Sequence, residues 1–174
     1  MQKKRYSLFV IFLSIFLLTA LTSCNGNIEK NQEEAVTKAQ NAFFAGKTEP
    51  NHEMDALSLY LPFGMEIDAT NPYNILLKKG DHSYILFINP HESLDSQVIY
   101  ETTIQAAQDL RIQEQFTDEG KFGFIIIQDV DRDRYSLTVG IGGIKITTET
   151  DANDLPKEAE MMMKIVSSVT LKNE

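Results

Sequence analysis

The stretch that decides the fold is Leu57–Asp68, "LSLYLPFGMEID", in which every odd-numbered position up to Ile67 is apolar. Side chains of a β-strand alternate between the two faces of a sheet, so this period of two predicts a strand with one buried face. Pro62 and Gly64 fall on the outward face. Because proline lacks the N–H that a strand ladder needs, they predict an edge strand or a bulge.

Further strands are predicted after this one. "NPYNILLKK" and "HSYILFIN" meet at Gly80-Asp81, a pair that favours a two-residue hairpin turn. Three or four more strands are expected over about 111–117, 122–129, 134–140 and 143–149, because "DEGK", "DRDR" and "GIGG" mark turns between them. The "GIGGIK" glycines are followed by strand and not by a helix, so they predict a tight turn and not a phosphate-binding loop.

Three segments carry helix signals. Over 32–45, apolar residues recur at helical spacing and Gly46 stands where a C-terminal cap would be. Residues 94–109 are rich in β-branched side chains, but they have a candidate cap at Ser93 or Ser96 and no breaker, so we predict a helix, with a strand as the alternative. A last helix is expected from Asn153 or Asp154, with Pro156 in its first turn.

The order of these elements predicts an α+β domain. Its mostly antiparallel sheet has about six to seven strands, with an N-terminal, a middle and a C-terminal helix packed on it. The order loosely resembles the α/β/α sandwich of PsbP-like domains, through the opening strand "LPFGMEI", a central hairpin and a closing helix that ends in "SSVTL". The resemblance implies an architecture and no chemistry.

The only cysteine of the chain, Cys24, follows an apolar N-terminal run. Lys3, Lys4 and Arg5 precede "SLFVIFLSIFLLTAL", which is shorter than the roughly 20 residues of a membrane span but typical of a secretory signal. The run ends in Leu21-Thr22-Ser23-Cys24, and this resembles the lipobox of bacterial lipoproteins. The resemblance implies that Leu21, Thr22 and Ser23 direct processing and that Cys24 receives a diacylglyceryl group and becomes the new N-terminus. An uncleaved N-terminal anchor is the alternative.

Three regions are therefore expected: a signal peptide over 1–23, a lipidated cysteine with a polar tether over 24–32, and a single α+β domain over 33–174. The membrane is a partner through this lipid, and the domain is expected on the extracytoplasmic side of the cell membrane. No other cofactor is expected.

Composition excludes several classes of function. The chain has 25 acidic and 16 basic residues, for a net charge of −9. Removal of residues 1–23 takes away three basic residues and no acidic one, so the mature charge would be −12. No basic stripe is available for nucleic acid. With Cys24 lipidated, no thiol remains for a disulfide, thiol catalysis or a cysteine-ligated metal.

Asp129, Asp131 and Asp133 alternate like the first ligands of a calcium loop. However, Arg134 stands where such a loop needs glycine, and Gly140 stands where it needs a bidentate glutamate. These aspartates are weak metal candidates, and a solvated hairpin tip is the preferred interpretation.

The three histidines lie at His52, His82 and His91. His82 follows Asp81, and His91 precedes Glu92, so either pair offers a proton-transfer group beside a carboxylate. The sequence contains no nucleophile elbow and no His-Glu-x-x-His motif. We therefore predict a non-enzymatic domain that binds an envelope protein or ligand. The alternative is an extracytoplasmic hydrolase or small-ligand binder that uses His82 or His91 with neighbouring carboxylates.

Overall fold

The computed structural model describes residues 23–131 and 133–172. The described chain forms a seven-stranded sheet, a three-stranded sheet and three helices, and both sheets are antiparallel. This confirms the predicted α+β class with a large antiparallel sheet.

The large sheet has the strand order β3-β4-β5-β9-β8-β7-β6. Its strands are β3 (Met65–Asn71), β4 (Asn74–Lys79), β5 (His82–Ile88), β6 (Leu110–Asp118), β7 (Lys121–Asp131), β8 (Arg134–Ile141) and β9 (Ile144–Asp151). The hairpin turn predicted at Gly80-Asp81 joins β4 to β5, with Gly80 at a φ of +58°. The four strands predicted between 111 and 149 are confirmed.

The stretch Leu57–Asp68 is not one strand. β2 (Leu57–Leu59) lies in the small sheet, between β1 (His52–Glu53) and β10 (Thr170–Leu171), whereas β3 begins at Met65. Between them the Met65 N–H donates to the Pro62 carbonyl over 2.9 Å, and Gly64 has a φ of +77°, as in a type II turn. The apolar residues of both flanking strands fall at odd-numbered positions, so a single alternation in the sequence runs through the turn, although β2 also buries Ser58.

The break at Pro62 changes two expectations. Phe63, predicted to point inward, is fully exposed at the turn. The edge position is confirmed, because β3 is the first strand of the large sheet.

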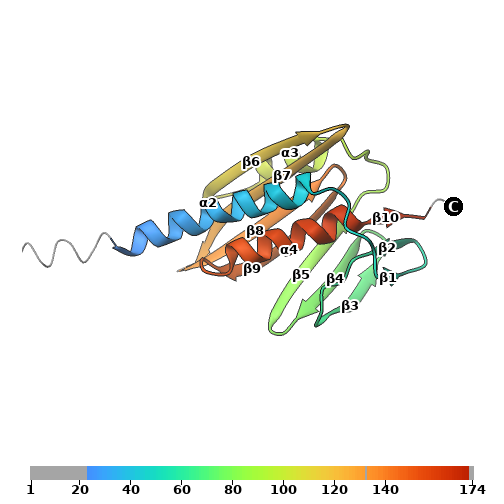
Figure 1. Ribbon diagram of the computed structural model, residues 1–174, viewed down its shortest axis with the longest axis horizontal. Helices are drawn as coiled ribbons and strands as arrows, with labels where there is room; N and C mark the ends of the chain where they lie inside the picture. The colour runs from blue at the N-terminus through green and yellow to red at the C-terminus, as the bar shows by residue number, and fades with distance from the viewer. Residues whose placement is uncertain (1–22, 132, 173–174) are drawn as a thin grey trace, which may run out of the picture.

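Helices α2 (Ser23–Phe44) and α4 (Leu155–Ser168) lie side by side on one face of the large sheet (Figure 1). Ala35, Ala39 and Phe43 of α2 are buried in the same core as Met162 and Val166 of α4. The ion pair between Lys38 Nζ and Glu160 Oε2, at 3.3 Å, joins the two helices at the surface. The predicted C-terminal helix is confirmed, with Pro156 in its first turn.

Helix α2 begins nine residues earlier than predicted, at Ser23. Ile28, Gln32 and Ala35 recur at helical spacing; Ile28 packs against the core, and Gln32 is only 6% exposed. The polar residues between them occupy the outer face. Residues 24–32, expected to be a polar tether, are therefore helical. Leu21, Thr22 and the apolar run lie outside the described residues.

The middle helix α3 (Val98–Ala106) confirms the helix predicted within 94–109, and it lies on the opposite face, behind β6 and β7 (Figure 1). Tyr100 packs between Phe122 and Phe124, with ring centroids 5.5 Å from each. The hydroxyls of Thr102 and Thr103 donate to carbonyls of the preceding turn, and this accommodates β-branched residues in the helix.

A carboxylate lies in the core between α4 and the sheet. Glu158 is 5% exposed, and its Oε2 accepts a hydrogen bond of 2.8 Å from the Tyr84 hydroxyl on β5. Burial, and then this contact with Glu158, raises the pKa of Tyr84. In the described residues, the nearby buried hydroxyl of Thr150 has no hydrogen-bond partner.

Candidate functional site

The three histidines do not converge. His82 opens β5 and His91 follows its other end, so the strand separates them by about 20 Å at 3.3 Å per residue. His52 is exposed on β1, in the small sheet. His91 is exposed, and its backbone N–H donates to Asn89 Oδ1 over 3.1 Å. A hydrolytic site that uses His82 and His91 together is not formed.

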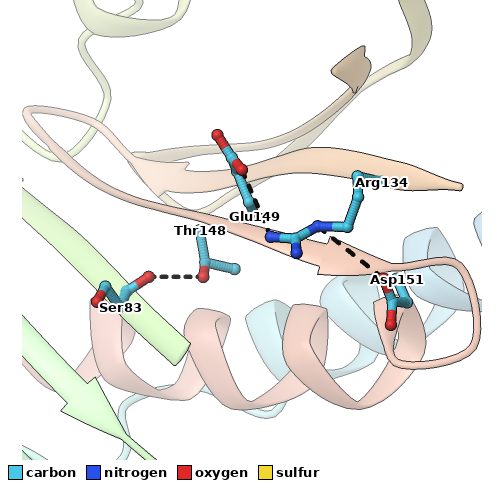
Figure 2. A network of polar contacts seen from close by, with 5 residues as sticks. All are labelled: Ser83, Arg134, Thr148, Glu149 and Asp151. Carbon is cyan, nitrogen blue, oxygen red and sulfur yellow. Dashed lines mark hydrogen bonds and ion pairs between the residues drawn. The ribbon is translucent and has the colours of Figure 1, made fainter. Parts of the chain in front are cut away.

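His82 lies beside a cleft where β5 and β9 separate. The β5–β9 ladder stops at the pair Tyr84 and Thr148, although both strands continue beyond it. Thr148 Oγ1 donates to the Ser83 carbonyl over 2.7 Å and closes the end of the ladder (Figure 2). The resulting cleft of about 540 Å³ is open, and polar and apolar atoms share its lining about equally.

Three of the charged side chains that line this cleft form ion pairs with one another. Arg134 lies between two carboxylates, with NH2 at 3.4 Å from Glu149 Oε2 and Nε at 3.9 Å from Asp151 Oδ1 (Figure 2). All three side chains are exposed, so the ion pairs are weak but the guanidinium already has its partners. The guanidinium of Arg134 is therefore paired, whereas Asp81, which also lines the cleft, makes no hydrogen bond or ion pair to the described residues.

The turn that carries Asp129, Asp131 and Asp133, which we call the aspartate turn, has an arginine beside it. Arg111 contacts Asp129 Oδ2 through Nε at 2.6 Å and through NH2 at 2.5 Å, and this pairing raises the pKa of the guanidinium. Asp133 stands at the turn, with a φ of +59°. Within residues 23–131 and 133–172, no three His, Cys, Asp or Glu side chains are grouped as metal ligands.

An apolar groove of about 350 Å³ lies where helix α2 ends. Three segments far apart in the sequence build it: residues 43–47 after α2, the loop 89–94 after β5, and residues 166–171 at the end of α4 and in β10. The buried side chains of Phe43, Ile141, Ile144 and Val166 form its floor. Leu94 and Leu171, which are 46% and 37% exposed, stand at its rim. We call this hollow the apolar groove.

Two lysines border the apolar groove, and neither makes a hydrogen bond or ion pair to the described residues. Lys47 follows α2, and Lys121 opens β7. Asp118 lies opposite Lys121 in the β6–β7 ladder, but no ion pair joins these described residues. Glu92, a predicted candidate, is also at the rim; its Oε2 accepts a hydrogen bond from Ser96. The groove therefore combines an apolar floor with two unpaired lysines and one carboxylate, Glu92, at its rim.

A second hollow, of about 1010 Å³, lies on the other side of β10. It runs between residues 54–57 and the β3–β4 turn, and Leu171 borders both hollows. Tyr73, which is 51% exposed, stands at its edge.

Lys47 and Lys121 were not among the residues predicted from the sequence. They are 74 positions apart, and each stands in an ordinary polar turn. The adjacent phenylalanines at 43 and 44 indicated only that the helix packs on a sheet. Only the fold brings the two lysines to one rim.

No protein-family model matches the sequence, and no curated protein sequence matches it. Among solved structures, the chain is similar to cyanobacterial PsbP (CyanoP) from Synechocystis sp. PCC 6803, with 13% identity and a TM-score of 0.37. The match covers 70% of this chain and 96% of that chain. The likeness is weak, is of the PsbP-like kind that the sequence suggested, and carries no conclusion about function.

Among the helices of residues 23–131 and 133–172, none combines the length and hydropathy needed to span a membrane.

Proposed function

We propose that this chain is a bacterial lipoprotein whose domain is non-enzymatic and binds an envelope protein or ligand. In this proposal Cys24 carries a diacylglyceryl group and holds the domain on the extracytoplasmic side of the cell membrane. The observation that supports a binding role is the apolar groove with its two unpaired lysines.

The anchor has a sufficient physical basis. Each buried methylene contributes about 0.8 kcal/mol, and stable attachment needs two acyl chains, which a diacylglyceryl group supplies. The sequence Leu21-Thr22-Ser23-Cys24 places that group next to the start of α2.

Helix α2 then separates the anchor from the apolar groove. Its 22 residues span about 33 Å at 1.5 Å per residue. The helix packs against the core from Ile28 onward, so the domain would be held close to the membrane with the groove directed away from it. The aspartate turn lies near the start of α2, and its acidic side chains would be repelled by anionic headgroups.

Ligand binding is the better supported part of the alternative function. A groove of about 350 Å³ is within the range of small-molecule sites, roughly 300–1,000 Å³. The hydrolase alternative has no comparable support, because His82 and His91 lie at opposite ends of β5.

The experiment follows processing of Cys24→Ser beside Ser23→Ala, which keeps a small residue before the cysteine. Cells expressing the full chain are labelled with palmitate, and the N-terminus of the product is identified by mass spectrometry. We expect the unchanged chain and Ser23→Ala to be labelled and to begin at lipidated Cys24, whereas Cys24→Ser remains an unlabelled precursor. Absence of label and of cleavage in the unchanged chain would reject the lipoprotein proposal.

A further inference from the structure

The floor of the apolar groove suits a hydrocarbon chain better than a peptide. Phe43, Ile141, Ile144 and Val166 are each at most 6% exposed and present only carbon atoms. A peptide lying on them would leave its backbone N–H and C=O groups unpaired, and this is costly. An acyl chain has no such groups, so it loses nothing on this surface.

Two polar side chains at the rim, Ser167 and Asn89, already have partners within the domain. The Ser167 hydroxyl donates to the Lys164 carbonyl over 3.1 Å. Asn89 Oδ1 accepts from the His91 backbone N–H over 3.1 Å. The groove therefore selects for an apolar chain.

The lysines at the rim indicate the charge of the ligand's end group. Most basic side chains of the described chain have a polar partner: those at positions 38, 78, 111, 134, 164 and 172 pair with carboxylates, and Lys145 donates to Thr103. Within residues 23–131 and 133–172, only Lys30, Lys47, Lys121 and Lys157 have no such contact. Two of these four border the apolar groove, in a chain with 25 acidic and 16 basic residues.

We propose that the apolar groove binds a free fatty acid, with its chain on the floor and its carboxylate between Lys47 and Lys121. This inference rests on the binding role proposed above and names the chemical class of its ligand. A free fatty acid fits better than a phospholipid for two reasons. The groove is small for two acyl chains, and α2 would hold it about 33 Å from the anchor, away from the bilayer.

The test uses the lipidated chain in phosphatidylcholine nanodiscs. It is irradiated with a photoreactive medium-chain fatty acid, and the cross-linked peptides are identified by mass spectrometry. We expect cross-links on residues 43–47 and 166–171. Decanoate should compete about tenfold better than decanol, because only decanoate carries a charge for the lysines.

Two variants with the same change in charge separate the groove from general electrostatics. Lys47→Gln combined with Lys121→Gln should lower the cross-linking yield about fivefold and abolish the preference for decanoate over decanol. Lys30→Gln combined with Lys157→Gln removes two other unpaired lysines. It should leave the cross-linking yield and the preference for decanoate unchanged. Leu171→Glu, at an exposed position of the rim, should lower the yield by placing a carboxylate beside the ligand.

Equal yields in the two double variants would overturn the inference, as would cross-links concentrated at residues 81–83 and 149–151 or in the second hollow. Any of these results would reject a fatty acid at this groove. The palmitate experiment on Cys24 would still decide the lipoprotein proposal independently.

Discussion

The two ends of helix α2 lie beside surfaces of opposite character. Near its start, charged side chains are numerous and several of them are paired, as Arg111 is with Asp129 and Arg134 is with Glu149. Near its end, charges are few, and Lys47 and Lys121 lie unpaired at an apolar groove among the described residues. In the binding role that we propose, the groove is distinguished by unpaired lysines beside exposed carbon and not by the number of its charges.

The largest expected effect on stability is at Gly142, in the β8–β9 turn that packs against the loop 89–94. Gly142 has a φ of +53°, and a Cβ there would lie 2.6 Å from Leu94 Cα and also overlap the Ser93 carbonyl. We expect Gly142→Ala to lower the free energy of unfolding by about 3 kcal/mol, because left-handed strain and a backbone clash act together. Denaturant unfolding measures this change.

Gly120→Ala is the matched control. Gly120 has a φ of +77°, but a Cβ there meets nothing within 4 Å. Gly120→Ala should therefore lower the free energy of unfolding only by the cost of a left-handed backbone, about 1–2 kcal/mol. Equal losses for the two variants would show that the loop 89–94 does not pack tightly on the β8–β9 turn.

A smaller effect is expected at the buried pair of Tyr84 and Glu158. Tyr84→Phe removes the donor to Glu158 Oε2. It should lower the free energy of unfolding by about 1–3 kcal/mol, because the acceptor remains buried. Glu158→Gln keeps an acceptor for the Tyr84 hydroxyl and should cost less. A reversed order, measured by urea unfolding at neutral pH, would contradict this account of the core.

The same pair predicts a pH dependence. Burial and Glu158 raise the pKa of Tyr84, so the folded state favours the neutral phenol. This contribution to stability is complete below about pH 10, the pKa of an unperturbed tyrosine, and is lost as the pH rises above it. Tyr84→Phe should therefore unfold with a shallower dependence on alkaline pH. An unchanged slope would show that Tyr84 ionises normally.

The smallest effect is expected among the exposed pairs near the start of α2. Arg134→Gln removes two ion pairs whose members are all about half exposed or more. We expect less than about 1 kcal/mol change in the free energy of unfolding, and less still in high salt. A larger loss in thermal or urea unfolding would mean that the paired charges of this region hold the fold together.

Local patterns predicted the repeating parts of the fold. The Gly80-Asp81 hairpin, the strands from 110 to 151 and the helix after Asp154 each depend on neighbours in sequence, and each is present. The break at Pro62 was missed because the apolar residues of the strands on its two sides all fall at odd-numbered positions. The early start of α2 was missed because, among residues 27–32, the side chains that pack toward the core are Ile28 and Gln32, too few to show a helical period.

The candidate site depended on contacts that no local pattern records. Asp129, Asp131 and Asp133 drew attention by spacing, but Arg111, from a neighbouring strand, pairs with Asp129. His82 and His91 drew attention by their chemistry, but β5 holds them apart. Lys47 and Lys121 carried no motif, and only the packing of β7 with segments distant from it in the sequence makes them neighbours of one groove.

Hydrogen–deuterium exchange on the full chain in nanodiscs, with and without decanoate, tests most directly which of the two surfaces binds the proposed ligand. The account predicts slower exchange over residues 43–47, 89–94 and 166–171, with no change over 81–83 and 149–151. Protection confined to the cleft beside His82, or no protection in any of these segments, would contradict it.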